Sequence, residues 1–563
     1  MTVDRDLKPA RAALKAKDFK RAETIANAVL EANPKAHKAY HILSLSAREQ
    51  NDWGRAESTI QSALDIAPDD PETLNSYGNI LSITMRGPEA QVQYSRALKR
   101  APNYLSPALA LGQLLLREKN PIEAAEVFRA ALQHNPKHSG LMIGLFYALK
   151  EAEQIEQAQA LLQQLPPSPD LFLARGELAN LLDQKPVAET NFIQGLGHGP
   201  IAGQSFRQLI ALTHRYDGVE AAAARINEII AASPEQGGFY LAATDILSDL
   251  GQMEAAFGWL DQCVKKFGNQ AEISLLRVKM LIEAGEGAAA FEISEAILKE
   301  RKGDLAVMSL FVKAALMTER FDLALQASKA AQIRQRNNQF WIAIEALALR
   351  GLGQEALYNA LYNYDAIQLM NFDRPPEYNI QPDFINALKA ACEERLGHEN
   401  SYYGGVLGSA LREGKRTRRD LRFASSRVLQ DYFQALVQPV TDYIDTLETD
   451  KNHPLYQRKA EGYRLSEVWA DKLSVNGHYE KHIHPSAWLT AHYFIETPSS
   501  MQSVSFGEPP FKVPNMGADF HIKPQAGQLL IYPSYMWFGS EAPNIKTRDD
   551  NMTLLLSSLV VPR

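Results

Sequence analysis

The residues best suited to chemistry are two histidines, His482 and His484, in the stretch HIHP near the C-terminal end. Residues two apart on an extended chain project to the same face, so both imidazoles can hold one ion. Imidazole nitrogen is a good ligand for iron, copper and zinc. His478 and His492 lie close by in the sequence and are equally well explained as rim or core residues. An H-x-H pair therefore leaves a metal site and a structural role both open.

Short segments rich in β-forming residues surround this pair and begin at residue 463. They are YRLSEVWADKLSV, WLTAHYFIE, SVSFGE, QLLIYPS and MTLLLSSLVV, separated by Gly, Pro and Asn. Two helical patterns precede them, at 384–396 and 423–447, and an aperiodic stretch at 371–384 predicts a loop. Helices followed by several short strands predict an α+β domain, in which helices cover a double-sheet jelly roll.

The N-terminal part of the chain repeats every 34 residues. Prolines recur at 34, 68, 102 and 136, and alanines at 22, 56, 90, 124 and 158. After a slip of four residues around 165–170, alanines resume at 188, 222, 256, 290 and 324, with prolines at 200 and 234 in register. Alanine suits the close crossing of two paired helices, and proline ends the second helix because it lacks an N–H group. Such helical hairpins stack into an all-α superhelix with a concave surface.

This pattern resembles the tetratricopeptide repeat, with about ten or eleven units over residues 5–360. The resemblance implies that the groove binds a peptide or protein segment, or that the chain forms a homo-oligomer. The alternative is a spacer that only holds the C-terminal region. We therefore expect a multidomain chain with a repeat array at 1–362, a helical support segment at 363–462 and a jelly-roll core at 463–563.

The C-terminal region, about residues 370–563, resembles a family of 2-oxoglutarate–Fe(II) oxygenases that often follow tetratricopeptide repeats. The stretches that carry this resemblance are GKRTRRDL, YRLSEVWADKL, GHYEKHIHPSAWLTAHYFIETP, VSFGEPPF, HIKPQAGQLLIYPSYMWFGSEAPN and MTLLLSSLVVPR. The family implies hydroxylation of a peptide or protein side chain, with Fe(II) and 2-oxoglutarate as cofactors. By position, His482 and His484 correspond to the proximal pair of iron ligands.

Two functional positions depart from the family pattern. The distal histidine would follow PSYMW, where this chain has Phe538, and the arginine that clamps 2-oxoglutarate would stand at Asn551. Phenylalanine cannot ligate a metal, and asparagine has no charged fork for a carboxylate. Two imidazoles alone bind ferrous iron weakly, because affinity depends on the number of ligands. A substitute third ligand would have to be His521 or Asp519, and a substitute clamp Arg548.

Two hypotheses about function follow. In the first, the oxygenase fold is catalytically degenerate, needs no cofactor and serves recognition, with Phe538 filling the space of the metal. In the second, it is an active dioxygenase with a non-standard third ligand. A further set of aromatic residues can line a substrate pocket or simply pack in the core and rim: Trp488, Tyr493, Tyr535, Trp537 and Phe538.

The composition of the chain limits the kinds of binding partner that we expect. A net charge of −7 over 563 residues leaves no basic footprint, so nucleic acid and anionic membranes are not expected to bind. No apolar run is long enough to span a membrane, and the N-terminus lacks the apolar core of a signal peptide. Two cysteines, Cys263 and Cys392, are too few for a disulfide framework, so we expect a cytoplasmic protein.

The basic run at 411–422 is expected to be a solvated loop, with phosphate or acidic-peptide binding as the alternative.

Overall fold

The computed structural model describes residues 5–197, 199–397, 410–450, 452–460, 462–498, 501–541 and 552–562. The chain divides into two compact units. The first comprises Met1–Leu165 with the short segments Glu300–Leu305 and Ile333–Asn337, and the second comprises the remaining residues. Among the helices described, none is long and apolar enough to cross a membrane.

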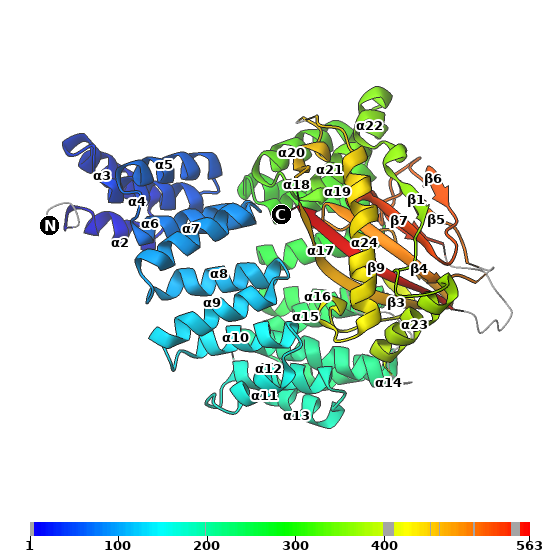
Figure 1. Ribbon diagram of the computed structural model, residues 1–563. Coiled ribbons are helices and arrows are strands. Elements are labelled where there is room, and N and C mark those ends of the chain that lie inside the picture. Colours follow the sequence, from blue (N-terminus) through cyan, green and yellow to red (C-terminus); the bar gives the residue numbers. More distant parts are fainter. Residues whose placement is uncertain are drawn as a thin grey trace. The chain divides into compact units, whose positions relative to one another are not determined.

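The first unit is built from pairs of antiparallel helices, drawn in blue and cyan in Figure 1. They are α2 (Lys8–Lys15), α3 (Phe19–Ala32), α4 (His37–Glu49), α5 (Trp53–Ile66), α6 (Pro71–Ile83), α7 (Gly87–Arg100), α8 (Leu105–Arg117), α9 (Pro121–His134), α10 (Ser139–Glu151) and α11 (Ile155–Leu162). Helices α3, α5, α7 and α9 each end two residues before one of the regularly spaced prolines, as the sequence predicts.

Helix pairs continue in the second unit. They are α12 (Pro169–Leu181), α13 (Lys185–Gly195), α14 (Ala202–Ala232), α15 (Gly237–Asp249), α16 (Met253–Phe267), α17 (Ala271–Glu283), α18 (Gly287–Glu300), α19 (Leu305–Met317), α20 (Phe321–Arg334), α21 (Gln339–Gly351) and α22 (Glu355–Leu361), with short 3-10 turns η1 (Gly199–Ile201) and η2 (Tyr364–Ala366). The predicted slip corresponds to the short helix α11 and the segment before α12. Helix α14 is broken at Gly218, whose φ of 87° is readily adopted only by glycine.

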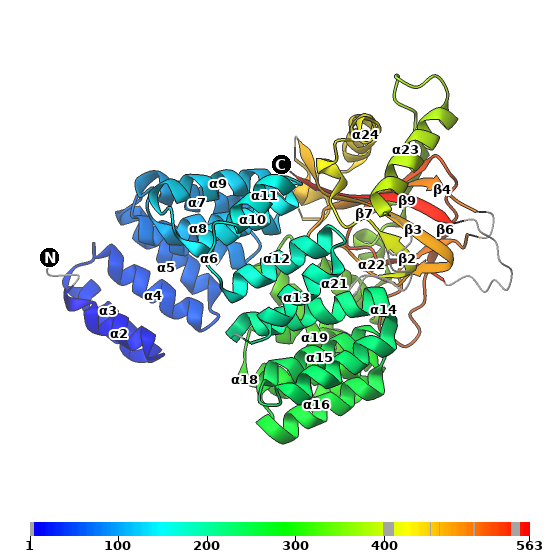
Figure 2. The same cartoon turned by 90° about the horizontal axis from the view of Figure 1, so that it is seen from below.

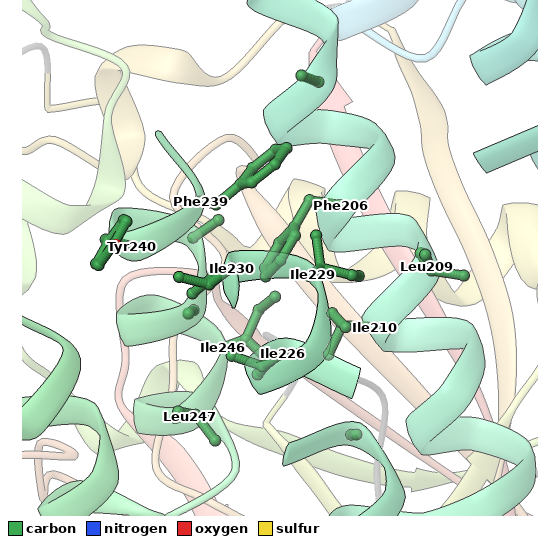
Figure 3. Close-up of a cluster of buried hydrophobic side chains, with 14 of the residues drawn as sticks. Phe206, Leu209, Ile210, Ile226, Ile229, Ile230, Phe239, Tyr240, Ile246 and Leu247 are labelled. Carbon is green, nitrogen blue, oxygen red and sulfur yellow. The ribbon is translucent and has the colours of Figure 1, made fainter. Parts of the chain in front are cut away.

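The repeating alanines explain how the helices pack. All ten are fully buried, namely Ala22, Ala56, Ala90, Ala124, Ala158, Ala188, Ala222, Ala256, Ala290 and Ala324. Figure 3 shows one such core, where the two halves of α14 meet α15. There the rings of Phe206 and Phe239 stack with centroids 5.0 Å apart, beside Ile226 and Ile230. Small residues at the crossings let the larger side chains fill the space between helices.

Two antiparallel sheets form the C-terminal part of the second unit. A six-stranded sheet has the order β1-β7-β4-β9-β3-β2, and a three-stranded sheet has the order β6-β5-β8. The strands are β1 (Gln368–Asn371), β2 (Leu411–Arg416), β3 (Tyr463–Tyr479), β4 (Leu489–Glu496), β5 (Val504–Phe506), β6 (Phe520–Ile522), β7 (Gln528–Pro533), β8 (Phe538–Ser540) and β9 (Thr553–Pro562). The five predicted strand segments and both predicted helices are present, the helices as α23 (Gln381–Leu396) and α24 (Arg427–Thr446).

The expectation of a solvated loop at 411–422 is wrong for its first half. Residues Leu411–Arg416 form the edge strand β2, which pairs with β3. The charges there are neutralised across the sheet, since Arg412 pairs with Glu480 at 2.8 Å and Arg416 with Asp471 at 2.7 Å. Charged residues are compatible with an edge strand, where they also oppose pairing with another chain.

Neighbouring side chains of β4 point to opposite faces of the large sheet. On one side Tyr493 packs against Phe372, which follows β1, and against Phe384 of α23 and Tyr432 of α24. Figure 2 shows α23 and α24 together on this side of the strands. On the other side His492 contacts Phe538 of the small sheet, with ring centroids 4.8 Å apart. The space between the two sheets is therefore where the predicted site residues meet.

Candidate functional site

The histidine pair lies in the loop that joins β3 to β4 and is fixed by main-chain hydrogen bonds. The N–H of His482 donates to the carbonyl of Phe538 at 2.8 Å, and the N–H of Phe538 donates to the carbonyl of His482 at 2.9 Å. The N–H of His484 donates to the carbonyl of Ser534 at 3.1 Å. The HIHP loop and the PSYMWF segment are thus held together by their backbones.

The two imidazoles lie side by side, as the spacing predicts. Their ring centroids are 5.1 Å apart, and the rings are nearly perpendicular. Nδ1 of His482 lies 2.8 Å from the carbonyl oxygen of Glu480, which makes Nδ1 the donor and leaves the lone pair on Nε2. Nε2 of His484 has no hydrogen-bond partner among the described atoms. Burial lowers the pKa of His482 to about 4, so the ring is neutral near pH 7.

Phe538 occupies the position next to this pair. Its ring centroid lies 5.7 Å from that of His482 and 5.5 Å from that of Phe506, and it stacks on Tyr532 at 5.4 Å. Phe538 is also the cross-strand partner of His482. Within the described residues the donor set at this position is therefore two imidazoles, because the phenyl ring beside them offers no lone pair, and it is one ligand short of a facial iron site.

A third histidine, His492, lies near the pair but has both ring nitrogens engaged. Nδ1 is 2.9 Å from the hydroxyl of Ser557, and Nε2 is 3.0 Å from the hydroxyl of Tyr532. Its side chain is buried, and burial lowers its pKa to about 3. Such a histidine is hydrogen-bonded as a core residue and has no nitrogen left for a metal.

The two candidate third ligands lie on or beside β6. His521 is exposed and pairs with Ser505 through the backbone of β5. The carboxylate of Asp519 accepts hydrogen bonds from the hydroxyls of Tyr358 at 3.2 Å and Tyr364 at 3.0 Å, and it pairs with Arg350. Among the described residues no group of three His, Cys, Asp or Glu side chains is arranged to hold a metal ion. The two candidate cosubstrate residues, Arg548 and Asn551, lie outside the described residues.

The five aromatic residues expected to line a pocket are spread over different surroundings. Trp488 donates its indole N–H to the carbonyl of Leu455 at 2.9 Å, and Tyr493 lies on the helix-covered side of the sheet. Tyr535 donates its hydroxyl to the carbonyl of Leu361 at 2.9 Å. Trp537 packs edge-on against Phe511. Of these five, Phe538 is the residue whose ring contacts the histidine pair among the described ring contacts.

A buried ionic cluster beside the pair escapes sequence reasoning. The carboxylate of Asp471 is fully buried and accepts four hydrogen bonds, two from Arg416 at 2.7 and 2.9 Å, one from Trp469 at 2.8 Å and one from Tyr479 at 2.6 Å. The Trp469 ring lies 5.7 Å from that of His484. The sequence signal that could have found it is an aspartate within an apolar strand, with a tryptophan two residues before it on the same face.

The neighbouring cavity is small. It lies between β3, β5, β8 and β9, and Tyr479, Phe494, Phe538 and Leu555 are among its lining residues. Its volume of about 30 Å³ holds one or two water molecules. Pockets for small molecules are typically about 300–1,000 Å³. A cavity of this volume is too small to hold a dicarboxylate.

Models of known protein families match both the N-terminal and the C-terminal part of the chain. Tetratricopeptide repeat models match residues 7–71, 86–139 and 115–171. The model described as "Putative 2OG-Fe(II) oxygenase" matches residues 467–548, which include the histidine pair and Phe538. The chain carries tetratricopeptide repeats in its N-terminal part and a 2OG-Fe(II) oxygenase-like domain at 467–548. No curated protein matches it.

Solved structures with a likeness to this tetratricopeptide repeat protein include other repeat proteins. A Pseudomonas aeruginosa PilF structure is 18% identical, covers 40% of this chain and 97% of its own, and has a TM-score of 0.31. PilW, a type IV pilus biogenesis factor, is 18% identical, with coverages of 36% and 98% and a TM-score of 0.32. A tetratricopeptide repeat protein from Parabacteroides merdae is 16% identical, with coverages of 49% and 98% and a TM-score of 0.30. At these TM-scores the likenesses carry no functional inference.

The last repeat is hydrogen-bonded to both loops of the oxygenase-like domain that carry the site. The N–H of Gln339, at the start of α21, donates to the carbonyl of Pro485 at 2.9 Å. The N–H of Trp537 donates to the hydroxyl of Tyr362 at 2.7 Å, and the rings of Tyr362 and Tyr535 meet edge to face. Helices α21 and α22 therefore take part in positioning the HIHP and PSYMWF segments.

Proposed function

We propose that this chain is a scaffold that binds peptide or protein segments, and that its oxygenase-like domain, a variant jelly roll, contributes a binding surface rather than iron-dependent oxidation. One observation carries the proposal. Phe538, the backbone partner of His482, places an apolar ring where the family resemblance requires the distal imidazole. A phenyl ring supplies no lone pair, so the facial set of three ligands is incomplete.

Three further features support the proposal that the oxygenase-like domain has lost its catalytic activity. The position of the cosubstrate arginine holds Asn551, which offers no charge to a carboxylate. Arg416, whose charge acts on both histidines, is committed to Asp471 through a bidentate contact. The cavity at Phe538 has a volume of about 30 Å³. Each feature removes one requirement for holding 2-oxoglutarate in this place.

The proposal is tested by anaerobic Fe(II) titration of the full chain, followed by an assay of 2-oxoglutarate turnover. The matched control is the variant His482→Ala/His484→Ala. We expect the native chain and the control to bind iron equally weakly, and neither to consume 2-oxoglutarate above background. Iron binding by the native chain that His482→Ala abolishes, together with turnover, would contradict the proposal.

The second candidate is an active dioxygenase with a non-standard third ligand. The Nε2 atoms of the two histidines favour it, because both are available as ligands. Nε2 of His482 keeps its lone pair, and Nε2 of His484 is without a partner among the described atoms. A third ligand would then have to be Asp519 or His521, with Arg548 as the clamp. In the same titration, His521→Ala or Asp519→Ala would lower iron affinity if this candidate were correct.

For the repeat array we propose a peptide or protein segment as the ligand, because within each unit the stacked first helices of the repeats give a continuous surface. The alternative occupant is a second copy of the chain. Light scattering across a range of protein concentrations separates the two. A monomer that captures peptides from a library supports the proposal, and a stable dimer that captures none contradicts it.

A further inference from the structure

Arg458 of the oxygenase-like domain is a cation that has no acid beside it. It is the last residue of the short 3-10 turn η4 (Tyr456–Arg458), between α24 and β3 in the sequence. Its Nη1 donates a hydrogen bond of 3.1 Å to the main-chain carbonyl of Ala487. A guanidinium carries five N–H groups, and within the described part of the chain the other four meet neither a carboxylate nor another acceptor.

The side chain of Arg458 is strongly desolvated and yet remains reachable. Burial lowers its pKa to about 10, and no neighbouring acid opposes this shift. The guanidinium therefore stays charged at pH 7. The residue is half-buried, so part of its surface is still open to the solvent. A ligand can approach the charge from that side.

The missing partner of Arg458 is an oxyanion. Taking a cation out of water is costly unless a group of opposite charge replaces the water, and arginines that are removed from water are usually paired for this reason. The carbonyl of Ala487 supplies a partial charge and engages one N–H group. Two oxygens of a carboxylate or a phosphate fit the remaining fork, because the planar guanidinium presents parallel N–H groups.

The position of Arg458 connects this charge to the candidate site. Ala487, which accepts its hydrogen bond, donates its own N–H to the carbonyl of His484 at 3.2 Å. The two residues between His484 and Ala487 are exposed. Trp488 donates its indole N–H to the carbonyl of Leu455 at 2.9 Å, so the segment around η4 and the start of β4 are held together at two points. An anion bound at Arg458 lies beside the loop that carries the histidine pair.

We propose that Arg458 forms an anion-binding site beside the HIHP loop, and that its ligand is a carboxylate or phosphate group held by two parallel hydrogen bonds. This inference goes beyond the proposed function, because it concerns a free oxyanion and depends neither on the repeats nor on a metal. Arg416 does not compete for the anion, since its guanidinium is already paired with Asp471.

The test measures thermal unfolding of the full chain in chloride buffer at constant ionic strength, with inorganic phosphate and glutarate added in separate titrations. An anion that binds the native state raises the Tm. Phosphate also stabilises proteins through exclusion from their surface, so the decisive quantity is the difference between the native chain and Arg458→Met, which lacks the charge.

We expect Arg458→Met to weaken the binding of at least one of the two anions by about ten- to hundredfold, as loss of a charge-assisted contact implies. Arg458→Lys keeps the charge without the fork and should bind more weakly than the native chain, which provides a second variant if Arg458→Met does not fold. The matched control is Arg427→Met, which removes an exposed arginine of α24 and should leave binding unchanged.

The two anions distinguish the sources of the ligand. Stabilisation by phosphate alone supports a phosphorylated ligand, and stabilisation by glutarate alone supports a carboxylate. If the native chain, Arg458→Met and Arg458→Lys respond equally to both anions, the inference is overturned. An equal loss of binding in Arg427→Met overturns it as well, because the effect would then belong to the general surface charge. The iron titration that tests the proposed function is independent of these outcomes.

Discussion

The backbone N–H of Trp537 donates a hydrogen bond of 2.7 Å to the side-chain hydroxyl of Tyr362, and both residues are buried. Tyr362 directly follows α22, the last repeat helix, and Trp537 directly precedes Phe538. A residue of the repeat array therefore supplies the hydrogen-bond acceptor for the main chain next to the candidate site. The position of Phe538 depends on the last repeat as well as on the sheets.

Removing this hydroxyl should destabilise the second unit. In Tyr362→Phe the N–H of Trp537 remains buried without an acceptor, which costs about 1–3 kcal/mol. Urea unfolding followed by tryptophan fluorescence measures the change, since five of the six tryptophans lie in this unit: Trp259, Trp341, Trp469, Trp488 and Trp537. Tyr40→Phe, at a half-buried tyrosine of the first unit, is the control and should change the free energy of unfolding little. An equal effect of both variants would contradict the argument.

Restoring the residues of the family pattern should create iron affinity. Phe538→His adds a third imidazole beside His482, and Asn551→Arg adds a charged fork for a carboxylate. The double variant should bind Fe(II) at least about tenfold more tightly than the native chain, because affinity rises with ligand number. Anaerobic titration measures this change. Adding His482→Ala to the double variant should abolish the gain, and a gain that survives this third substitution would show that iron binds elsewhere.

Breaking the buried ion pair next to the histidines should be costly. In Asp471→Asn the guanidinium of Arg416 loses its bidentate carboxylate, and loss of one partner of a buried pair typically costs about 3–5 kcal/mol. Chemical unfolding of Asp471→Asn, Arg416→Met and the double variant forms a double-mutant cycle. The double variant should be more stable than the sum of the single effects predicts. Additive effects would mean that the two side chains do not stabilise each other.

The first unit should lose stability on mild acidification through His41. Burial lowers the pKa of His41 to about 4, and its Nε2 lies 2.7 Å from the hydroxyl of Ser76. In the unfolded chain a histidine titrates near pH 6.5, so the unfolded state binds more protons between about pH 6.5 and pH 4. Stability is therefore full above pH 6.5 and falls as the pH drops towards 4, by about 3 kcal/mol at most.

His41→Asn should remove this pH dependence. Urea unfolding at pH 7 and pH 4.5 measures it, and His134→Asn, at an exposed histidine of the same unit, serves as the control. The loss of stability between the two pH values should be smaller in His41→Asn than in the native chain and unchanged in His134→Asn. An unchanged loss in His41→Asn would exclude this histidine as its source.

The parts of the fold that depend on local sequence are predictable, and those that depend on register are not. The alanines and prolines act within one helical hairpin, so their spacing reveals the repeats. The proximity of His482 to Phe538 follows from the family pattern, in which both positions carry ligands. By contrast, the contact of Arg416 with Asp471 requires β2 to pair with β3 in one register. The sequence of β2 is rich in charged residues and therefore does not predict a strand. The hydrogen bond between Tyr362 and Trp537 joins residues 175 positions apart, and neither sequence segment indicates the other.

The hydrogen bonds that pair His482 with Phe538 join main-chain atoms, and this has an evolutionary consequence. Amide and carbonyl groups are the same in every residue except proline, so these two hydrogen bonds can form whatever other side chain stands at 538. Ligand and non-ligand can be exchanged there by substitution without rebuilding the scaffold. Lineages that carry this architecture can thus gain or lose a metal ligand while the backbone pairing persists.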